Sequence, residues 1–366
     1  MCTRGLLSLI LLLALAAGCS EGGIGGTGSV VPGPDPLLVS GQANKGPFDA
    51  GAVITATRLS GAGQVQAETV GRLGEFSLSL LPDAAYQIRV NGRYFSETGG
   101  VVPDAPVTLT AVVSPRENEP VNVNVATHLI HRRVLALIDD GTAASTAIDM
   151  ATSELVATLS PLLPAPANPL EFTQLALINA AQAQPNEEGN AWLLALGALI
   201  EIAAGPDVGE LLDSLATGFA VSGRLDSNLL TPLQLAMRQV NPDDVHASLI
   251  GLEPAFSQGV LVASGAFTQA QAALANCRVF GSTLLCTGEM ALPAGSLDNA
   301  LGELASATSE TFSISSLVAD MNRFIDSDGD GLVNAVDPDD DNDGIADSAD
   351  AAPYDNQLPA TPGGVM

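Results

Sequence analysis

The sequence contains very little positive charge. Of 366 residues, 13 are lysine or arginine, and Lys45 is the single lysine. Against these stand 41 acidic residues, which give a formal net charge of −28. No strongly basic face can form from this composition, so a nucleic-acid-binding protein and a protein held on anionic lipid by charge are both excluded. Three histidines and four cysteines leave little material for a transition-metal site.

The N-terminus has the pattern of an export signal. Arg4 is followed by an uncharged stretch over residues 5–18, which is too short to span a bilayer and is typical of a signal peptide. The sequence Leu15-Ala-Ala-Gly-Cys19 resembles a bacterial lipobox. That resemblance implies that Cys19 becomes the lipidated first residue of the mature chain, and Ser20 after it favours the outer membrane. The alternative is a soluble secreted protein in which Cys19 is incidental.

A short spacer and a region of alternating polarity follow. Residues 19–36 are rich in glycine and proline, which predicts a tether. Period-2 alternation over 53–58, 75–80, 86–90 and 107–112 predicts short strands. The segments Val39-Ser-Gly41, Lys45-Gly-Pro-Phe48 and Gly71-Arg-Leu-Gly-Glu-Phe-Ser77 resemble the carboxypeptidase-regulatory-like (transthyretin-like) β-sandwich. The resemblance implies a spacer or interaction module over residues 37–115.

Beyond residue 115 the pattern becomes helical. Residues 121–125 alternate once more like a strand, and helices are expected from Thr127 to about 138 and over 144–160, 170–184, 188–204, 206–219 and 229–250. The stretch 191–201 is apolar on all sides, which predicts a buried core helix. His128 and His131 share a helix face, but adjacent arginines and the lack of a third ligand make zinc the less favoured interpretation.

Two cysteines flank a hairpin-like run. Cys277 and Cys286 enclose eight residues with a turn at Gly281-Ser282. After export they are the remaining pair, so a structural disulfide is predicted. A redox pair is the alternative, but redox cysteines usually have two residues between them.

The C-terminus carries two acidic loops with one spacing. Each has oxygen-bearing side chains at loop positions 1, 3, 5, 9 and 12 and a glycine at position 6. Every member of the second loop lies 13 residues after its counterpart in the first. Residues 326–355 hold eleven aspartates and no basic residue. Oxygens at these positions, with a carbonyl from position 7, suit the coordination of Ca²⁺ better than that of Mg²⁺.

This register resembles the thrombospondin type 3 repeat, in which a chain with almost no hydrophobic core winds around calcium ions. The spacing and the resemblance give one metal-ligand set: Asp326, Asp328, Asp330, Leu332, Asn334, Asp337, Asp339, Asp341, Asp343, Ile345, Asp347 and Asp350. Paired EF-hands and a dockerin do not fit, because 13 residues leave no room for the helices that they require. A disordered acidic tail would not keep the aspartates in register.

We therefore expect a multidomain α+β protein. Its parts are an N-terminal β-sandwich, a central all-α domain and a C-terminal calcium-binding repeat tail. The expected boundaries are signal peptide 1–18, lipidated tether 19–36, β-sandwich 37–115, helical domain 116–254, mixed segment with the disulfide hairpin 255–325, calcium repeats 326–355 and disordered tail 356–366.

The function expected from these features is non-catalytic. We predict a lipid-anchored protein of the bacterial cell envelope, at the outer membrane, that uses calcium and takes part in surface interaction or adhesion. Its partners would be the membrane, through the anchor, and a protein or cell-surface ligand, with no nucleic acid. The alternatives are a periplasmic ligand-binding or scaffold component and a hydrolase without a recognisable motif.

Overall fold

The computed structural model describes residues 35–82, 84–117, 119–177, 187–252, 277–280, 283–286 and 314–356. The predicted signal peptide, Cys19 and nearly all of the tether lie outside the described residues. So do most of the segment 255–325 and nearly all of the predicted tail 356–366.

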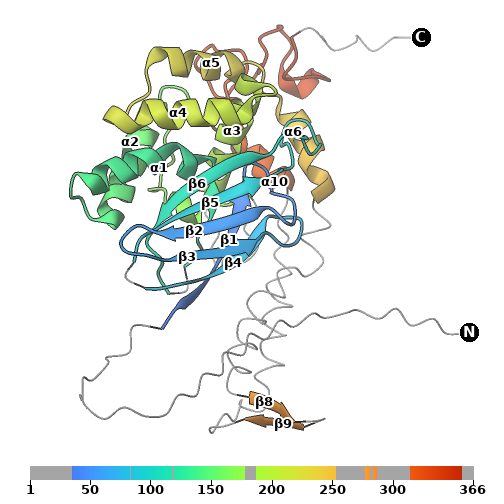
Figure 1. The fold of residues 1–366 in the computed structure, drawn as a ribbon. Helices are drawn as coiled ribbons and strands as arrows, with labels where there is room; N and C mark the ends of the chain where they lie inside the picture. The colour runs from blue at the N-terminus through green and yellow to red at the C-terminus, as the bar shows by residue number, and fades with distance from the viewer. Residues whose placement is uncertain are drawn as a thin grey trace, which may run out of the picture. The chain divides into compact units, whose positions relative to one another are not determined.

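Within the described residues, the N-terminal part forms two β-sheets (Figure 1). One sheet has the strand order β4-β1-β7 and the other β3-β2-β5-β6. The strands are β1 (Leu37–Asn44), β2 (Val53–Arg58), β3 (Gln64–Glu68), β4 (Glu75–Leu80), β5 (Tyr86–Gly92), β6 (Val107–Val113) and β7 (Val123–Asn124). The four strands predicted from alternation are therefore confirmed.

Strand register explains how the alternating residues become a core. In the larger sheet Ile54 lies opposite Val90, and Val90 lies opposite Leu109, so one row of buried side chains crosses three strands. Successive side chains of a strand point to opposite faces. The intervening residues Thr55 and Arg89 therefore point away from this row.

The helical part follows β7 and packs against the sheets. Helix α1 contacts strand β6 and helix α4, and Figure 1 shows both helices beside β6. The helices are α1 (Val125–Asp139), α2 (Ala144–Leu159), α3 (Glu187–Ala204), α4 (Val208–Ser222), α5 (Ser227–Met237), α6 (Pro242–Leu249) and α10 (Ile314–Met321), with short 3₁₀ turns η1 (Phe172–Gln174), η2 (Ile250–Leu252) and η3 (Asp347–Ala349). The expected α+β class is confirmed in this form, an N-terminal β-sheet region with a helical part.

The strand predicted over 121–125 is mostly wrong. Pairing is limited to β7, and helix α1 begins at Val125, two residues before the predicted start. The cause is a capping box: the Asn124 side chain accepts a hydrogen bond from the Thr127 amide, and the Thr127 hydroxyl accepts one from the Asn124 amide.

Two helix predictions also need correction. Residues 170–177, the described part of the helix expected over 170–184, contain the turn η1. There the Asn124 amide group donates to the carbonyls of Phe172 and Leu175. The helix expected over 229–250 is divided into α5 and α6, because Asn241 caps a new helix with Pro242 in its first turn.

Helix α3 is the buried core helix that the sequence predicts. Trp192 is fully buried, and its ring stacks on Phe172 with 5.7 Å between centroids. Side chains of the sheets and of the helices belong to one hydrophobic core. Within the described residues no single helix has the length and apolarity to cross a membrane; Glu188–Ala204 and Val208–Ser222 meet that measure together, with a 112° bend between them.

The predicted hairpin is present in the backbone. Strands β8 (Cys277–Phe280) and β9 (Thr283–Cys286) are antiparallel, and their register places Cys277 opposite Cys286. This pairing is compatible with the predicted disulfide, which stays a prediction.

Candidate metal centre

The acidic loops begin directly after a well-packed helix. Helix α10 contacts α3 and α6, and the residues that follow it, Phe324 and Ile325, are buried. Two further contacts tie the loops to this base: the Asn334 amide donates to the Ile325 carbonyl, and the Asn322 side chain donates to the Tyr354 hydroxyl at 3.1 Å. The packed base therefore fixes the position at which the first acidic loop starts.

The two loops repeat the same hydrogen bonds 13 residues apart. Position 1 accepts from the glycine amide at position 6, from Gly331 to Asp326 and from Gly344 to Asp339, both at 3.1 Å. Position 5 accepts from the amide at position 7 at 2.7 Å in both loops. The 13-residue spacing found in the sequence thus corresponds to a repeat of backbone hydrogen bonds in the structure.

Glycine is required at position 6 by the backbone. Gly331 has a φ of 101° and Gly344 a φ of 94°, a region that other residues rarely adopt. The turn allows the aspartates at positions 1, 3 and 5 to face one point. In each cluster, Asp326/Asp328/Asp330 and Asp339/Asp341/Asp343, one oxygen per carboxylate lies within 4.8 Å of the others. These two clusters can hold a metal ion.

Most of the clustered carboxylates are only half satisfied by the protein. One oxygen of Asp328, Asp341 and Asp343 accepts a loop amide, while the other is buried without a hydrogen-bond partner among the described residues. Asp341 as a whole is 6% exposed. Burying an ionised oxygen without a partner is costly, and a cation is the partner that removes this cost.

The pKa values are shifted in the same direction. Burial and the neighbouring carboxylates Asp343 and Asp350 raise the pKa of Asp341, and burial with Asp328 nearby raises that of Asp326. Like charges in a shared site oppose ionisation. Each cluster is therefore an excess of negative charge that a divalent ion would neutralise.

Position 9 is engaged in closing the loop. The Asn334 side chain accepts from the Ser327 amide and donates to the Ser327 hydroxyl, at 3.0 and 2.9 Å. In the second loop Asp347 accepts from the Asp340 amide at 2.8 Å. The position 12 carboxylates, Asp337 and Asp350, are not members of the two clusters, and the predicted ligands at position 7 are the carbonyls of Leu332 and Ile345. Asp350 has one buried oxygen without a partner among the described residues. The ligand roles of all these residues stay predictions.

Sequence reasoning missed Asp340. It occupies position 2 of the second loop, where the first has the neutral Ser327, and it is 4% exposed with one oxygen lacking a partner in the described structure. Burial, with Asp347 and Asp337 nearby, raises the pKa of Asp340 to about 7. The run of three aspartates at 339–341 was the available signal.

Replacing Asp340 should change the pH dependence of the metal-free protein. A carboxyl with a raised folded-state pKa binds protons preferentially in the folded state, so its ionisation lowers stability as the pH rises from about 4 to 7. We expect Asp340→Asn to raise the free energy of unfolding in a chelator by at most about 1 kcal/mol at pH 8 and hardly at all at pH 4. Urea titration at both pH values measures this, and an equal effect at both would contradict it.

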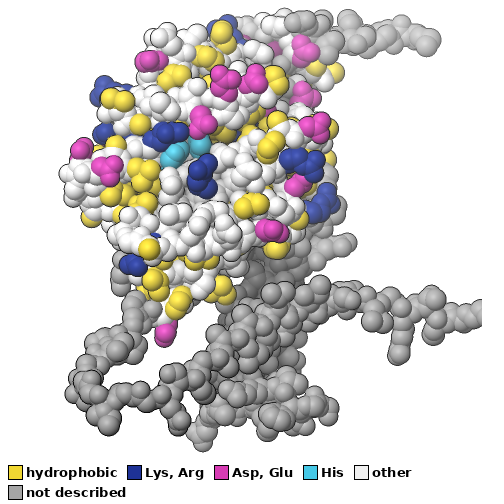
Figure 2. All heavy atoms as spheres, in the orientation of Figure 1, with side chains coloured by type: hydrophobic (Ala, Val, Ile, Leu, Met, Phe, Trp, Pro, Cys, Tyr) yellow, Lys and Arg dark blue, Asp and Glu magenta, His cyan; other side chains and the backbone are white. Residues whose placement is uncertain are grey.

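The histidine pair is buried and neutral. His128 and His131 have ring centroids 4.9 Å apart, and burial lowers the pKa of His128 to about 3. The nearest acidic oxygen, on Asp213, is 3.8 Å from His128 Nε2, and Arg132 contacts the same carboxylate. Figure 2 shows histidine side chains beside basic and acidic ones on the face that it draws. The adjacent positive charge still favours packing over a metal site.

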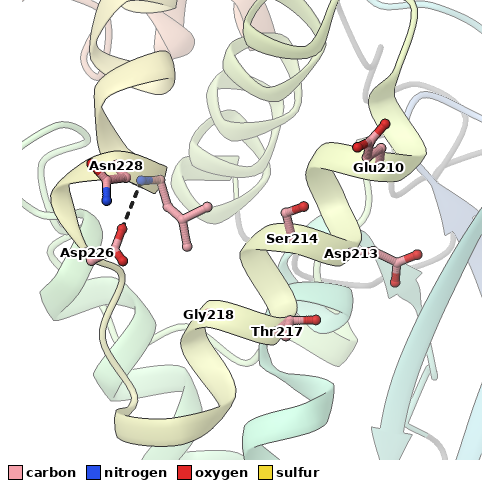
Figure 3. A pocket seen from close by; sticks show the side chains of 8 residues that line it. Glu210, Asp213, Ser214, Thr217, Gly218, Asp226 and Asn228 are labelled. Carbon is pink, nitrogen blue, oxygen red and sulfur yellow. Dashed lines mark hydrogen bonds between the residues drawn. The ribbon is translucent and has the colours of Figure 1, made fainter.

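A hollow of about 720 Å³ lies along helix α4 and the start of α5. Its lining includes acidic and polar side chains: Glu210, Asp213, Ser214 and Thr217 lie on α4, and Asp226 accepts the Leu229 amide at 3.1 Å (Figure 3). The three carboxylates that line the hollow, Glu210, Asp213 and Asp226, disfavour an anionic ligand.

Comparisons with protein-family models, with curated proteins and with solved structures found no match for this chain.

Proposed function

We propose that this chain is a lipid-anchored protein of the bacterial cell envelope, at the outer membrane, whose C-terminal loops bind calcium. Its role is surface interaction or adhesion without catalysis. Cys19 in its lipobox-like sequence would supply the anchor and residues 19–36 the tether. The β-sheet region would act as a sandwich-type spacer. The calcium loops would form the presented end.

One observation carries the calcium assignment. At position 3 of both loops, Asp328 and Asp341, one carboxylate oxygen accepts a backbone amide while the other is buried and unpartnered in the described structure. A cation coordinates such oxygens and also offsets the negative charge that several carboxylates bring together. Calcium takes six to eight oxygens in flexible geometry, whereas magnesium prefers to keep its waters. The number of protein oxygens in each loop therefore favours calcium.

Calcium would serve here in place of a hydrophobic interior. Of the three large apolar side chains in the first loop, Leu332 and Val336 are 46% and 69% exposed and Val333 is half-buried. The loops thus bury little apolar surface, and a bound ion would provide their cohesion. A rigid, acidic, calcium-loaded surface is suited to recognition by a protein or a cell-surface ligand.

A crosslinking pull-down from intact cells tests the interaction. With calcium present, we expect the wild-type chain to capture a defined partner that is lost in chelator and in Asp328→Ala/Asp341→Ala. A matched control, Glu68→Ala on the exposed edge of β3, removes an acidic residue elsewhere and should retain the partner. Capture that is the same with calcium, with chelator and in the double variant would refute a calcium-dependent interaction.

Loss of the anchor should release the protein. Cys19→Ser removes the thiol that would carry the lipid, and several acyl chains bury tens of CH₂ groups at about 0.8 kcal/mol each. We expect the variant to move from the membrane fraction to the soluble periplasmic or secreted fraction, as followed by fractionation and immunoblotting. An unchanged membrane fraction would show that Cys19 is not the anchor.

A further inference from the structure

The single lysine of the chain is fully buried between two carboxyl groups. Lys45 follows β1 and is 1% exposed. Its Nζ lies 2.5 Å from Glu97 Oε2 and 3.0 Å from Glu201 Oε2. The three residues come from the end of β1, from the connection between β5 and β6, and from helix α3. This cluster is independent of the calcium loops and of the function proposed above.

The residues around Lys45 enclose the cluster and leave room for the Glu97 carboxyl group. Glu97 is 1% exposed, and the Tyr94 ring lies 5.1 Å from Lys45 Nζ. Gly197 lies one helical turn before Glu201, and a Cβ at this position would be 2.8 Å from Glu97 Oε1. The absence of a side chain at Gly197 thus lets the Glu97 carboxyl lie against α3. The site has little contact with water.

The two carboxyl groups differ in their ionisation. Burial raises the pKa of Glu97 well above its usual value, although Lys45 opposes the shift. For Glu201 burial acts upward, but the Lys45 ammonium and the hydrogen bonds with Glu97, Ser96 and Lys45 together outweigh it and lower the pKa. The opposite directions of the two shifts favour a proton on Glu97 over a proton on Glu201.

We propose that Lys45 and Glu97 are joined by an amide bond that forms within the folded chain, with Glu201 as the proton carrier. An ammonium is not a nucleophile, and a carboxylate is a poor acyl donor. The cluster supplies what each needs: a base 3.0 Å from the amine and an acyl group held as the free acid.

The reaction balances without any added reagent. Glu201 takes one proton from the Lys45 ammonium, and the free amine attacks the Glu97 carboxyl carbon to give a tetrahedral adduct. The C–OH bond of the adduct then breaks. The hydroxyl leaves as water with a proton delivered by Glu201, which recovers a proton from the new amide nitrogen. The products are one amide, one water and a neutral Glu201.

The short distance between the reacting groups and the exclusion of water both favour amide formation. Groups held in reactive geometry reach effective concentrations of roughly 10⁵–10⁸ M. Exclusion of water opposes hydrolysis of the amide once it has formed. The Glu201 side chain is 11% exposed, so the released water has a way out beside it. In a buried ion triad the attraction between the charges barely offsets the cost of removing them from water. Formation of the amide removes two of these charged or acidic groups.

The single lysine makes the test simple. The full-length chain is purified, denatured in urea and treated with an endoproteinase that cuts after lysine. An unlinked chain is cut once, after Lys45. A linked chain resists, because the amide has no positive charge for the protease to recognise. Trypsin should then give the peptide ending at Arg58 joined to the peptide 94–116, lighter than their sum by one water. Complete cutting after Lys45, with both peptides at their sequence masses, would overturn the proposal.

Variants separate the chemistry from the fold. Glu201→Gln keeps the shape of the cluster but removes the proton acceptor, so we expect the lysine-specific cut to appear and the mass deficit of one water to disappear. Glu154→Gln, in the ion pair with Arg133 elsewhere in the chain, is the matched control and should stay uncut. If Glu201→Gln does not fold, the wild-type masses alone decide the question. A Glu201→Gln chain that is linked as fully as the wild type would rule out Glu201 as the proton carrier.

Discussion

Removal of calcium is expected to open residues 326–356 to hydrogen exchange and to proteolysis. Without cations, the carboxylates of each cluster repel one another, since one oxygen of each lies within 4.8 Å of the others. A ligand present at 100 times its Kd stabilises the state that binds it by about 2.7 kcal/mol per site. Amides such as those of Gly331 and Gly344 should therefore exchange roughly 100-fold faster in chelator for each site lost.

The loops also provide their own control. Asp328→Ala should accelerate exchange most strongly in the first loop, and Asp341→Ala in the second, because these residues occupy position 3 of their own clusters. Glu68→Ala, which changes the net charge equally but lies on β3, should leave both loops protected in calcium. Exchange that is identical with calcium and with chelator would mean that the loops are ordered by the protein alone.

Loss of the Lys45 side chain is expected to have a large effect on folding stability. Lys45→Ala leaves the buried Glu97 and Glu201 without their counter-charge, or without the amide if it has formed. Removing one partner of a buried ion pair costs about 3–5 kcal/mol. We expect a loss of this size in the free energy of unfolding, as measured by urea titration followed by circular dichroism.

Arg133→Ala provides the comparison. Arg133 makes two hydrogen bonds to Glu154, at 2.8 and 2.9 Å, but both side chains are partly exposed. Solvent screens such pairs, so we expect a loss of about 1 kcal/mol or less. Similar losses for the two variants would show that the Lys45 cluster contributes no more than a surface ion pair.

Local patterns predicted the regular elements well. Strands β2 and β4 match their predicted bounds, because a strand buried on one face fixes its alternation directly. The errors arose where side chains bind distant or adjacent backbone. Asn124 caps α1 and at the same time holds the turn at Phe172, and Asn241 starts a new helix inside one apolar pattern. The periodicity of hydrophobic residues carries no information about such side-chain hydrogen bonds.

The same distinction separates the two charged sites. Each acidic cluster is formed within one short loop. The spacing of Asp326, Asp328 and Asp330 was therefore enough to predict that their carboxylates lie close together. Lys45 lies 52 residues from Glu97 and 156 from Glu201, and no spacing connects them. Only the packing of α3 against the sheet connections brings these groups together. Asp340 is an intermediate case: it belongs to a short loop, but its burial depends on how the second loop closes and not on spacing alone.

Calorimetric titration of the full chain with calcium tests the central claim most directly. We expect saturable heat at or below millimolar calcium, reduced by Asp328→Ala or Asp341→Ala alone and abolished when both are changed. Heat that is absent from the wild-type chain at millimolar calcium, or unchanged in the double variant, would contradict calcium binding by these loops.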